Sequence, residues 1–337
     1  MSTDVYSIVT ERMIALLQSG VAPWRKTWCR GDCPRNLVSR KPYRGVNLLL
    51  LGSTTFASPY WLTFNQVQQL GGRVCKGAKS ELVIFWKLFD EANITNRKEA
   101  RKERTPKRIS MLRYYRVFNV QQTEGLEKHI PQQSAEQFTP IECAARIIET
   151  MPQRPSIRHD EPSAFYAPTR DYVNLPKPET FDTPADYYAV AFHELTHATG
   201  HETRLDRAGV AGSHALAPFG SGDYSREELV AELGSAFLCA EAGIGSTFKN
   251  SAAYLQGWLD VLQADSRLIV TAASAAQRAA DFILNRQDPP DTEAEGATKV
   301  APRQQKGDAK NNVTPIKTKK PQPRKRPATQ NQIKKTA

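Results

Sequence analysis

The sequence lacks the long hydrophobic runs of a membrane protein and contains few cysteines. No apolar run reaches the roughly eighteen residues that a membrane-spanning helix needs. The N-terminus carries Asp4 and Glu11 and has no long apolar core after a basic start, so we expect no secretory signal. Five cysteines are a sparse, odd set for 337 residues, as is typical of proteins in a reducing compartment. These absences together predict a cytoplasmic protein with no membrane partner.

The net charge of +11 is unevenly distributed along the chain. Residues 1–128 carry 22 Lys and Arg against 10 Asp and Glu, residues 129–298 carry 12 against 24, and residues 299–337 carry 12 against 1. The balances are therefore +12, −12 and +11. Because basic regions attract polyanions, contact with nucleic acid is predicted for the first region and the tail, and a different activity for the middle region.

Apolar patterns predict an α+β fold with two domains. Residues 1–128 combine helix patterns at 5–17 and 61–70 with strand patterns at 82–89 and 113–120, which we expect to form a hairpin. Residues 129–154 are a linker with one helix. Residues 155–288 hold short strands and three helices, at 184–199, 225–242 and 252–284, the last with a break near Asp265. Residues 289–337 are basic and poor in large apolar residues, so we expect a disordered tail.

One helix of the second domain carries His193-Glu194-Leu195-Thr196-His197, an H-E-x-x-H motif. Residues four apart lie on one face of a helix, so both imidazoles can converge on one ion with Glu194 beside them. Gly200 provides a C-terminal stop for this helix. The motif predicts a zinc-dependent metallopeptidase with His193 and His197 as metal ligands and Glu194 as general base.

A catalytic zinc site needs a third protein ligand and keeps its fourth position for water. His201 extends the motif, but in a continuing helix it would lie about 12 Å along the axis from His193, too far unless the chain turns. The better candidates are Glu228 and Glu232, which share a face of the next helix. We assign Glu228 to the metal and Glu232 to the free N–H of a histidine ligand. The reverse assignment stays open, as does a pair of solvated glutamates on an amphipathic helix.

The expected chemistry follows from this donor set. One Zn²⁺ per chain, or another divalent metal, would lower the pKa of its water and polarise the scissile carbonyl. Glu194 would take the proton of the water and pass it to the leaving amine. The donor to the tetrahedral oxyanion stays open among Tyr187, His214 and Tyr224, for each of which a surface or packing role is the alternative.

The first region interleaves aromatic rings with positive charge. Single-stranded nucleic acid is held by this pairing, with cations along the phosphates and rings beneath the bases. No helix-turn-helix, zinc-finger or RRM signature is present, so we expect no base-specific reading. For the rings that sit in apolar patterns, a place in the core is the alternative. The candidate DNA-binding residues are Tyr43, Arg44, Asn47, Trp61, Arg73, Lys76, Lys79, Tyr115 and Arg116.

Five blocks occur in order along the chain: P-Y-R-G-V-N at 42–47, S-P-Y-W-L-T-F at 58–64, G-G-R-V at 71–74, Y-R-V-F-N-V-Q-Q at 115–122 and H-E-L-T-H-A-T-G-H at 193–201. Over about residues 3–288 they resemble the ArdC family of plasmid and phage antirestriction proteins. The resemblance implies a single-stranded DNA-binding domain, related to one on plasmid primases of the TraC type, joined to a zincin-like metallopeptidase domain. It also implies His193, His197 and Glu228 as ligands and Glu194 as base. The tail after Pro289 matches nothing in the family.

The resemblance further implies protection of incoming DNA against host restriction during conjugation or infection, by one of three routes. In the first, bound DNA brings a working peptidase close to a host protein such as a restriction enzyme. In the second, the protein protects by coating single-stranded DNA, without hydrolysis. In the third, the zincin domain is only a metal-stabilised scaffold, for example in an accessory domain of a plasmid primase.

Overall fold

The computed structural model describes residues 4–25, 33–90, 108–131, 139–210, 222–245 and 252–286, all within one structural unit, Met1–Ala297. The predicted disordered tail and His214 lie outside the described residues, and Tyr224 is described in its backbone only. No described helix has the length and apolar composition to cross a bilayer.

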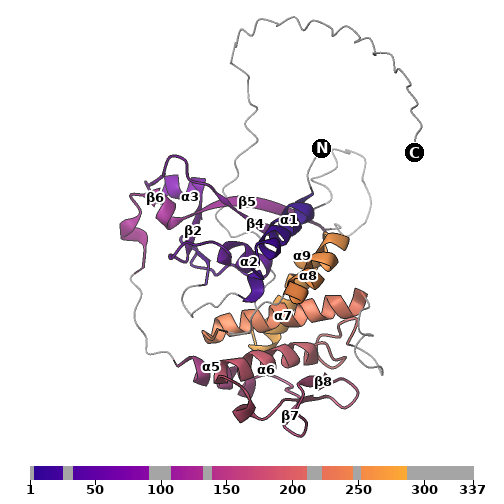
Figure 1. Cartoon of the computed structure of the whole chain (residues 1–337). Coiled ribbons are helices and arrows are strands. Elements are labelled where there is room, and N and C mark those ends of the chain that lie inside the picture. Colours follow the sequence, from indigo (N-terminus) through magenta and orange to yellow (C-terminus); the bar gives the residue numbers. More distant parts are fainter. Residues whose placement is uncertain are drawn as a thin grey trace, which may run out of the picture. The chain divides into compact units, whose positions relative to one another are not determined.

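The N-terminal part is built on a four-stranded sheet with the strand order β1-β2-β5-β4 (Figure 1). The long pair β4 (Glu81–Asp90) and β5 (Arg108–Asn119) is antiparallel, which confirms the predicted hairpin. The remaining elements are α1 (Val5–Gln18), η1 (Pro23–Arg25), β1 (Arg35–Asn36), α2 (Val46–Gly52), β2 (Tyr60–Thr63), α3 (Phe64–Gln69), β3 (Arg73–Val74), η2 (Val120–Gln122), β6 (Thr123–Glu124) and η3 (Glu127–His129).

The helix predicted over residues 61–70 is wrong in its first turn. Residues 60–63 form strand β2, and α3 begins only at Phe64. Thr63 and Gln66 form a capping box, in which each side chain accepts the backbone N–H of the other residue. This reciprocal cap ends the strand and starts the helix at one defined residue.

The C-terminal part packs helices over a small three-stranded sheet of order β7-β9-β8. The predicted break near Asp265 is confirmed, because two helices flank it and the Asp265 carboxylate accepts the backbone N–H of Arg267 at 2.8 Å. The elements are α5 (Pro140–Glu149), β7 (Ser156–Arg158), β8 (Phe165–Ala167), β9 (Tyr172–Asn174), η4 (Pro178–Thr180), α6 (Pro184–Ala198), α7 (Gly222–Ala242), α8 (Ala252–Ala264) and α9 (Leu268–Ile283).

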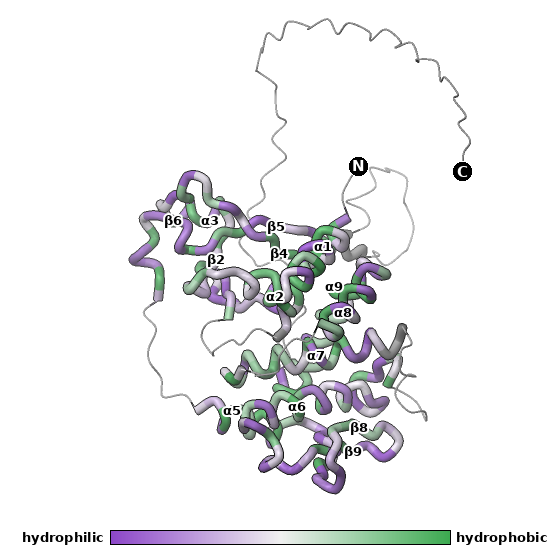
Figure 2. Tube along the Cα trace, in the orientation of Figure 1, coloured by the Kyte–Doolittle hydropathy of each residue, from purple (hydrophilic) through white to green (hydrophobic). Residues whose placement is uncertain are grey.

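One apolar core runs through both parts. It contains residues of α1, α2 and β4 together with residues of α6, α7 and α9, and Figure 2 shows apolar stretches along α1 and α9. The Trp24 ring packs edge-on against Trp258 of α8 at 5.9 Å between centroids, and its indole N–H donates to the Tyr254 hydroxyl at 2.8 Å. Thr10 of α1 donates to the carbonyl of Ser266 at 2.6 Å. The helices of the C-terminal part therefore share one core with α1, α2 and strand β4 of the N-terminal part.

Candidate metal centre and nucleic-acid interface

Helix α6 presents the H-E-x-x-H motif because its start is capped and one of its faces is buried. The hydroxyl of Thr183 accepts the backbone N–H of Asp186 at 3.2 Å. Leu195, between the two histidines, is fully buried in the core. After the helix the chain turns at Gly200, whose N–H donates to the carbonyl of His197 at 2.8 Å. The opposite face of α6 is thereby directed toward α7, the helix that carries Glu228.

The structure brings His193, His197 and Glu228 together. The two Nε2 atoms lie 3.2 Å apart, and the Glu228 carboxylate lies 3.6 Å from Nε2 of His193 and 3.5 Å from Nε2 of His197. In a tetrahedral zinc site with bonds of about 2.0–2.1 Å, two donor atoms are about 3.4 Å apart. Each pair of these groups thus has about the spacing of two corners of such a tetrahedron, although a different Glu228 oxygen faces each histidine, and these residues fit a divalent ion.

A buried carboxylate supports His197 from behind. Oε1 of Glu227, a residue only 4 % exposed, lies 3.2 Å from Nδ1 of His197. Arg207 donates to the same carboxylate at 2.6 and 3.1 Å. A carboxylate at Nδ1 fixes the tautomer that leaves Nε2 open for metal. At His197 this supporting position is taken by Glu227 and not by Glu232, for which it was predicted. Glu227 and Glu228 are neighbours about 100° apart around α7, so Glu227 faces Nδ1 of His197 and Glu228 faces Nε2.

The electrostatics of the site favour positive charge at its centre. Burial would lower the pKa of His197, but hydrogen bonds to Glu227 and Glu228 and the charge of Glu194 raise that pKa to about 10. Burial would raise the pKa of Glu228, but its bonds to the two histidines hold that pKa well below its ordinary value. A divalent cation would find the same attraction, and would displace the proton from His197.

The other residues predicted for this site have different surroundings. Glu194 follows the first histidine and is 8 % exposed. His201 lies beyond the turn that follows α6, where its Nδ1 is 2.9 Å from the Thr203 hydroxyl, and it is not part of the donor cluster. The Tyr187 hydroxyl lies 3.2 Å from Nε2 of His159. Of the three candidate oxyanion donors, Tyr187 is the one whose side chain the structure describes.

Three of the predicted DNA-binding residues lie inside the protein. Tyr43 is 7 %, Asn47 2 % and Trp61 1 % exposed. The Asn47 amide donates to the carbonyl of Ile84 and accepts its N–H, both at 2.7 Å, which ties α2 to the edge strand β4. All three residues are buried, so their side chains do not form an outer surface. A place in the core was the alternative for Trp61, whereas for Tyr43 and Asn47 the prediction of a DNA-facing side chain is wrong.

The remaining candidates differ in accessibility. The Arg44 guanidinium pairs with Asp281 of α9, and its side chain is 16 % exposed. Tyr115 is half-buried, with its ring 5.8 Å from that of Phe85. Four cations remain exposed: Arg73, which pairs with Glu124 at the surface, and Lys76, Lys79 and Arg116. Among the predicted residues, these four cations are the ones accessible to DNA at the surface of the N-terminal part.

Comparison with known proteins gives the family. Residues 3–118 match the model for the N-terminal domain of anti-restriction factor ArdC, and residues 144–275 match the model for a zincin-like metallopeptidase. Protein y4eC of Sinorhizobium fredii is 36 % identical over 304 residues, which are 85 % of this chain and 93 % of that protein. The chain belongs to the ArdC antirestriction family. The predicted resemblance and the two-domain α+β fold are thus confirmed.

Solved structures of the ArdC family agree. The metal-free crystal structure of the antirestriction ArdC protein from the R388 plasmid is 36 % identical, with a TM-score of 0.65 over 85 % of this chain and 100 % of that chain. Its Mn(II)-bound structure is 34 % identical, with a TM-score of 0.64 over 84 % and 97 %. DNA primase TraC of Escherichia coli is 35 % identical over 292 residues, but the match spans only 26 % of that protein. This ArdC-family chain is thus homologous to a minor part of the primase.

Two residues around the candidate metal centre, Glu227 and Arg207, were not predicted from the sequence. Glu227 directly precedes Glu228 in a short charged run that is followed by apolar residues. The first turn of a solvent-exposed helix has the same pattern, so the sequence does not single out Glu227. Arg207 lies in the segment that follows the motif and also donates to the carbonyl of Thr196 at 2.7 Å. The one signal in the sequence is that Glu227 is a second carboxylate beside the proposed ligand Glu228. Metal-ligating histidines commonly donate their other N–H to such a carboxylate.

Proposed function

We propose that this ArdC-family chain is a divalent-metal peptidase whose N-terminal part binds single-stranded DNA. The observation that supports the peptidase is the close approach of His193, His197 and Glu228 at distances that suit one divalent ion, with a glutamate next to the first histidine. We place the DNA-binding domain in residues 1–128 and the metallopeptidase domain in residues 155–288, joined by a linker at 129–154.

The donor set suits Zn²⁺, which prefers imidazole and carboxylate ligands in a four-coordinate site, with one ion per chain. The Mn(II)-bound crystal structure of the R388 protein agrees with a site that accepts more than one divalent ion. When bound, such an ion polarises a peptide carbonyl and acidifies water. His193, His197 and Glu228 would hold the ion, and Glu227 would keep the His197 ring in its binding tautomer.

Glu194 carries out the proton transfers in this proposal. Its carboxylate takes a proton from the attacking water and delivers it to the nitrogen of the leaving amine, as a general base and then a general acid. Its low exposure of 8 % keeps its charge poorly screened.

The test of the peptidase combines metal content with hydrolysis. After loading with Zn²⁺, wild type should retain one ion per chain, as should Glu194→Gln, whereas His193→Ala should not. Wild type should cleave members of a mixed peptide library, read by mass spectrometry, and Glu194→Gln should cleave none. Full activity of Glu194→Gln, or an absence of bound metal after every loading condition, would remove the proposal.

The DNA proposal rests on the positive balance of residues 1–128 and on the exposed cations Lys76, Lys79 and Arg116. Replacing these three by alanine should weaken binding of a single strand and reduce its salt slope by about 2, because each lost phosphate contact removes about 0.7. Replacement of the exposed Arg170 by alanine, in the metallopeptidase part, is the control for charge. An unchanged salt slope in the triple variant would refute this DNA-binding surface.

A restriction-protection assay in cells separates the routes to antirestriction. If peptide hydrolysis destroys a host protein such as a restriction enzyme, Glu194→Gln should fail to protect incoming DNA. If the protein acts as a coat on single-stranded DNA, Glu194→Gln should protect as well as wild type while the triple lysine and arginine variant fails. Protection by both variants would contradict both routes.

A further inference from the structure

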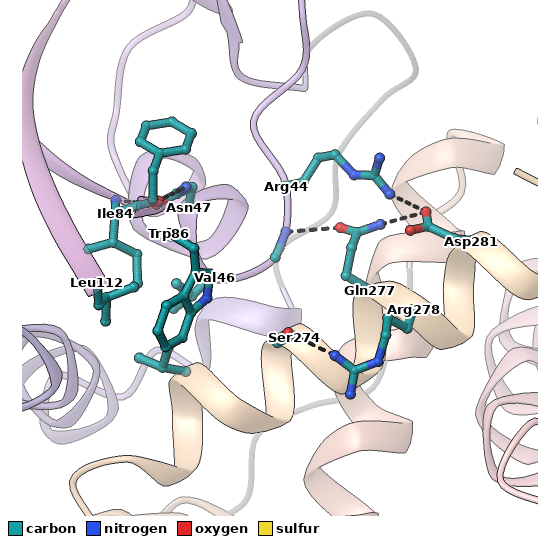
Figure 3. A pocket seen from close by; sticks show the side chains of 13 residues that line it. Arg44, Val46, Asn47, Ile84, Trp86, Leu112, Ser274, Gln277, Arg278 and Asp281 are labelled. Atoms are coloured by element: carbon teal, nitrogen blue, oxygen red, sulfur yellow. Dashed lines mark hydrogen bonds and ion pairs between the residues drawn. The ribbon is translucent and has the colours of Figure 1, made fainter. Parts of the chain in front are cut away.

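A cavity lies between the N-terminal sheet and helix α9, away from the metal centre. It measures about 340 Å³ and is bounded on one side by α2, β4 and β5 and on the other by α9 (Figure 3). Its apolar surface comes from Val46, Ile84, Leu112 and Val270. Polar groups come mainly from α9, so the cavity has an apolar wall and a charged wall.

Trp86 on β4 and Arg278 on α9 have groups available to a ligand. Trp86 is half-buried, and its indole N–H has no hydrogen-bond acceptor within the described part of the chain. Arg278 is exposed, and its guanidinium donates to the Ser274 hydroxyl at 3.1 Å but pairs with no carboxylate of the described residues. An aromatic face and an unneutralised cation therefore border the same space.

The rest of the charged wall is already fixed. Asp281 is neutralised by Arg44 and also accepts the Gln277 amide at 3.1 Å. The Gln277 carbonyl oxygen in turn accepts the backbone N–H of Gly45 at 2.9 Å. These bonds hold the loop before α2 against α9, so the cavity is preformed and its net charge is positive.

We propose that this cavity binds one nucleotide of a single-stranded DNA, with the base against Trp86 and the phosphate on Arg278. The proposal rests on the DNA binding proposed above and gives it a specific site. Tryptophan stacks on any base and arginine binds phosphate, so the combination selects a nucleotide without selecting its sequence.

Size and charge argue for this occupant. A volume of about 340 Å³ lies at the low end of ligand pockets, which suits one nucleotide and excludes a run of several. A purely apolar ligand would leave Arg278 and the indole N–H without partners. A metal ion would find only Asp281, whose charge Arg44 already balances.

The test uses the full chain and a single strand of roughly twelve nucleotides, within the site sizes known for such proteins. Trp86→Ala should weaken binding about 5- to 100-fold, since stacking on one ring contributes that much, and Trp86→Phe should recover part of the loss. Arg278→Ala should weaken binding and lower the salt slope by about 0.7. Arg170→Ala, again the control, should bind like wild type.

Photo-crosslinking with 5-bromodeoxyuridine in the strand locates the base directly. The adduct should appear in tryptic peptide 80–87, whose only tryptophan is Trp86. If wild type binds the strand but Arg278→Ala binds equally well and peptide 80–87 carries no adduct, the cavity proposal is overturned and the proposed DNA binding stands. If wild type binds no single strand at low salt, the DNA function itself fails. Should Trp86→Ala not fold, Arg278→Ala and the crosslink still decide.

Discussion

Replacing Glu227 by glutamine keeps the shape of the side chain and removes the negative charge that both His197 and Arg207 contact. In wild type the Glu227 carboxylate takes part in three contacts, at 3.2 Å with Nδ1 of His197 and at 2.6 and 3.1 Å with Arg207. Changes behind a metal-ligating histidine typically cost 10- to 100-fold in metal affinity, or about 1.4–2.7 kcal/mol. We expect a loss in this range for Glu227→Gln.

The same substitution destabilises the metal-free protein. The side chains of Arg207 and Glu227 are only 10 % and 5 % exposed, so the variant leaves a buried guanidinium without its carboxylate. Breaking such a pair costs about 3–5 kcal/mol. Arg207 keeps its bonds to the Thr196 carbonyl and the Thr199 hydroxyl, so we expect the lower end, about 3 kcal/mol.

Competition with a chromogenic chelator measures the metal affinity, and urea unfolding with and without Zn²⁺ measures stability. Glu232→Gln, in the same helix, is the matched control. If Glu232 rather than Glu227 supports a ligand histidine, the control will lose metal affinity and Glu227→Gln will not. That result would refute the role we assign to Glu227.

The remaining predictions concern packing and pH. Gly234→Ala should destabilise the protein by about 1–3 kcal/mol and weaken metal binding, because a Cβ there would lie 2.5 Å from Cγ2 of Thr196 and push α7 away from α6. Gly257→Ala, where a Cβ meets nothing within 4 Å, should stabilise the protein by about 0.5–1 kcal/mol. Thermal melts of both variants measure these changes in stability. Burial would raise the pKa of Asp171, but hydrogen bonds from Arg204 and the Tyr166 hydroxyl lower that pKa below its ordinary value of 3.8. The ionised carboxylate therefore stabilises the fold above pH 3.8, and this stabilisation is lost as the pH falls below that value. Asp171→Asn should cost about 2–3 kcal/mol at neutral pH, less than a fully buried pair because 35 % of the Asp171 side chain is exposed and water screens its charge. It should also flatten the acid limb of a stability profile, and an equally steep limb would contradict this linkage.

The clustering of the two histidines in the candidate metal site could be predicted because it depends on local geometry. A four-residue spacing on a helix places His193 and His197 on one face whatever surrounds them. The proposed third ligand, Glu228, needed only the prediction of a second helix that carries it. The contact of Glu227 with His197 could not be predicted, since it depends on how α7 is rotated against α6. The two helices approach each other closely where Gly234 meets Thr196.

Candidate DNA-binding residues were harder to select from the sequence, because composition does not separate exposed rings from buried ones. Trp61 and Tyr43 belong to an aromatic, basic region and yet lie in the core. Arg44 is charged and yet pairs with Asp281, a residue 237 positions away in sequence. Trp86, in contrast to these buried residues, borders a cavity formed with α9, and nothing in the strand pattern of the sequence indicates this position.

The apolar core that spans both parts has a consequence for how the protein responds to ligands. Because α1 packs on α8 and α2 on α9, neither half can unfold without exposing apolar surface of the other. Heat should therefore melt the chain in a single step, and any ligand bound by one half should raise the melting temperature of both. Fragments cut between the halves would lose this mutual protection, so substitutions in the intact chain are the sound way to assign separate roles.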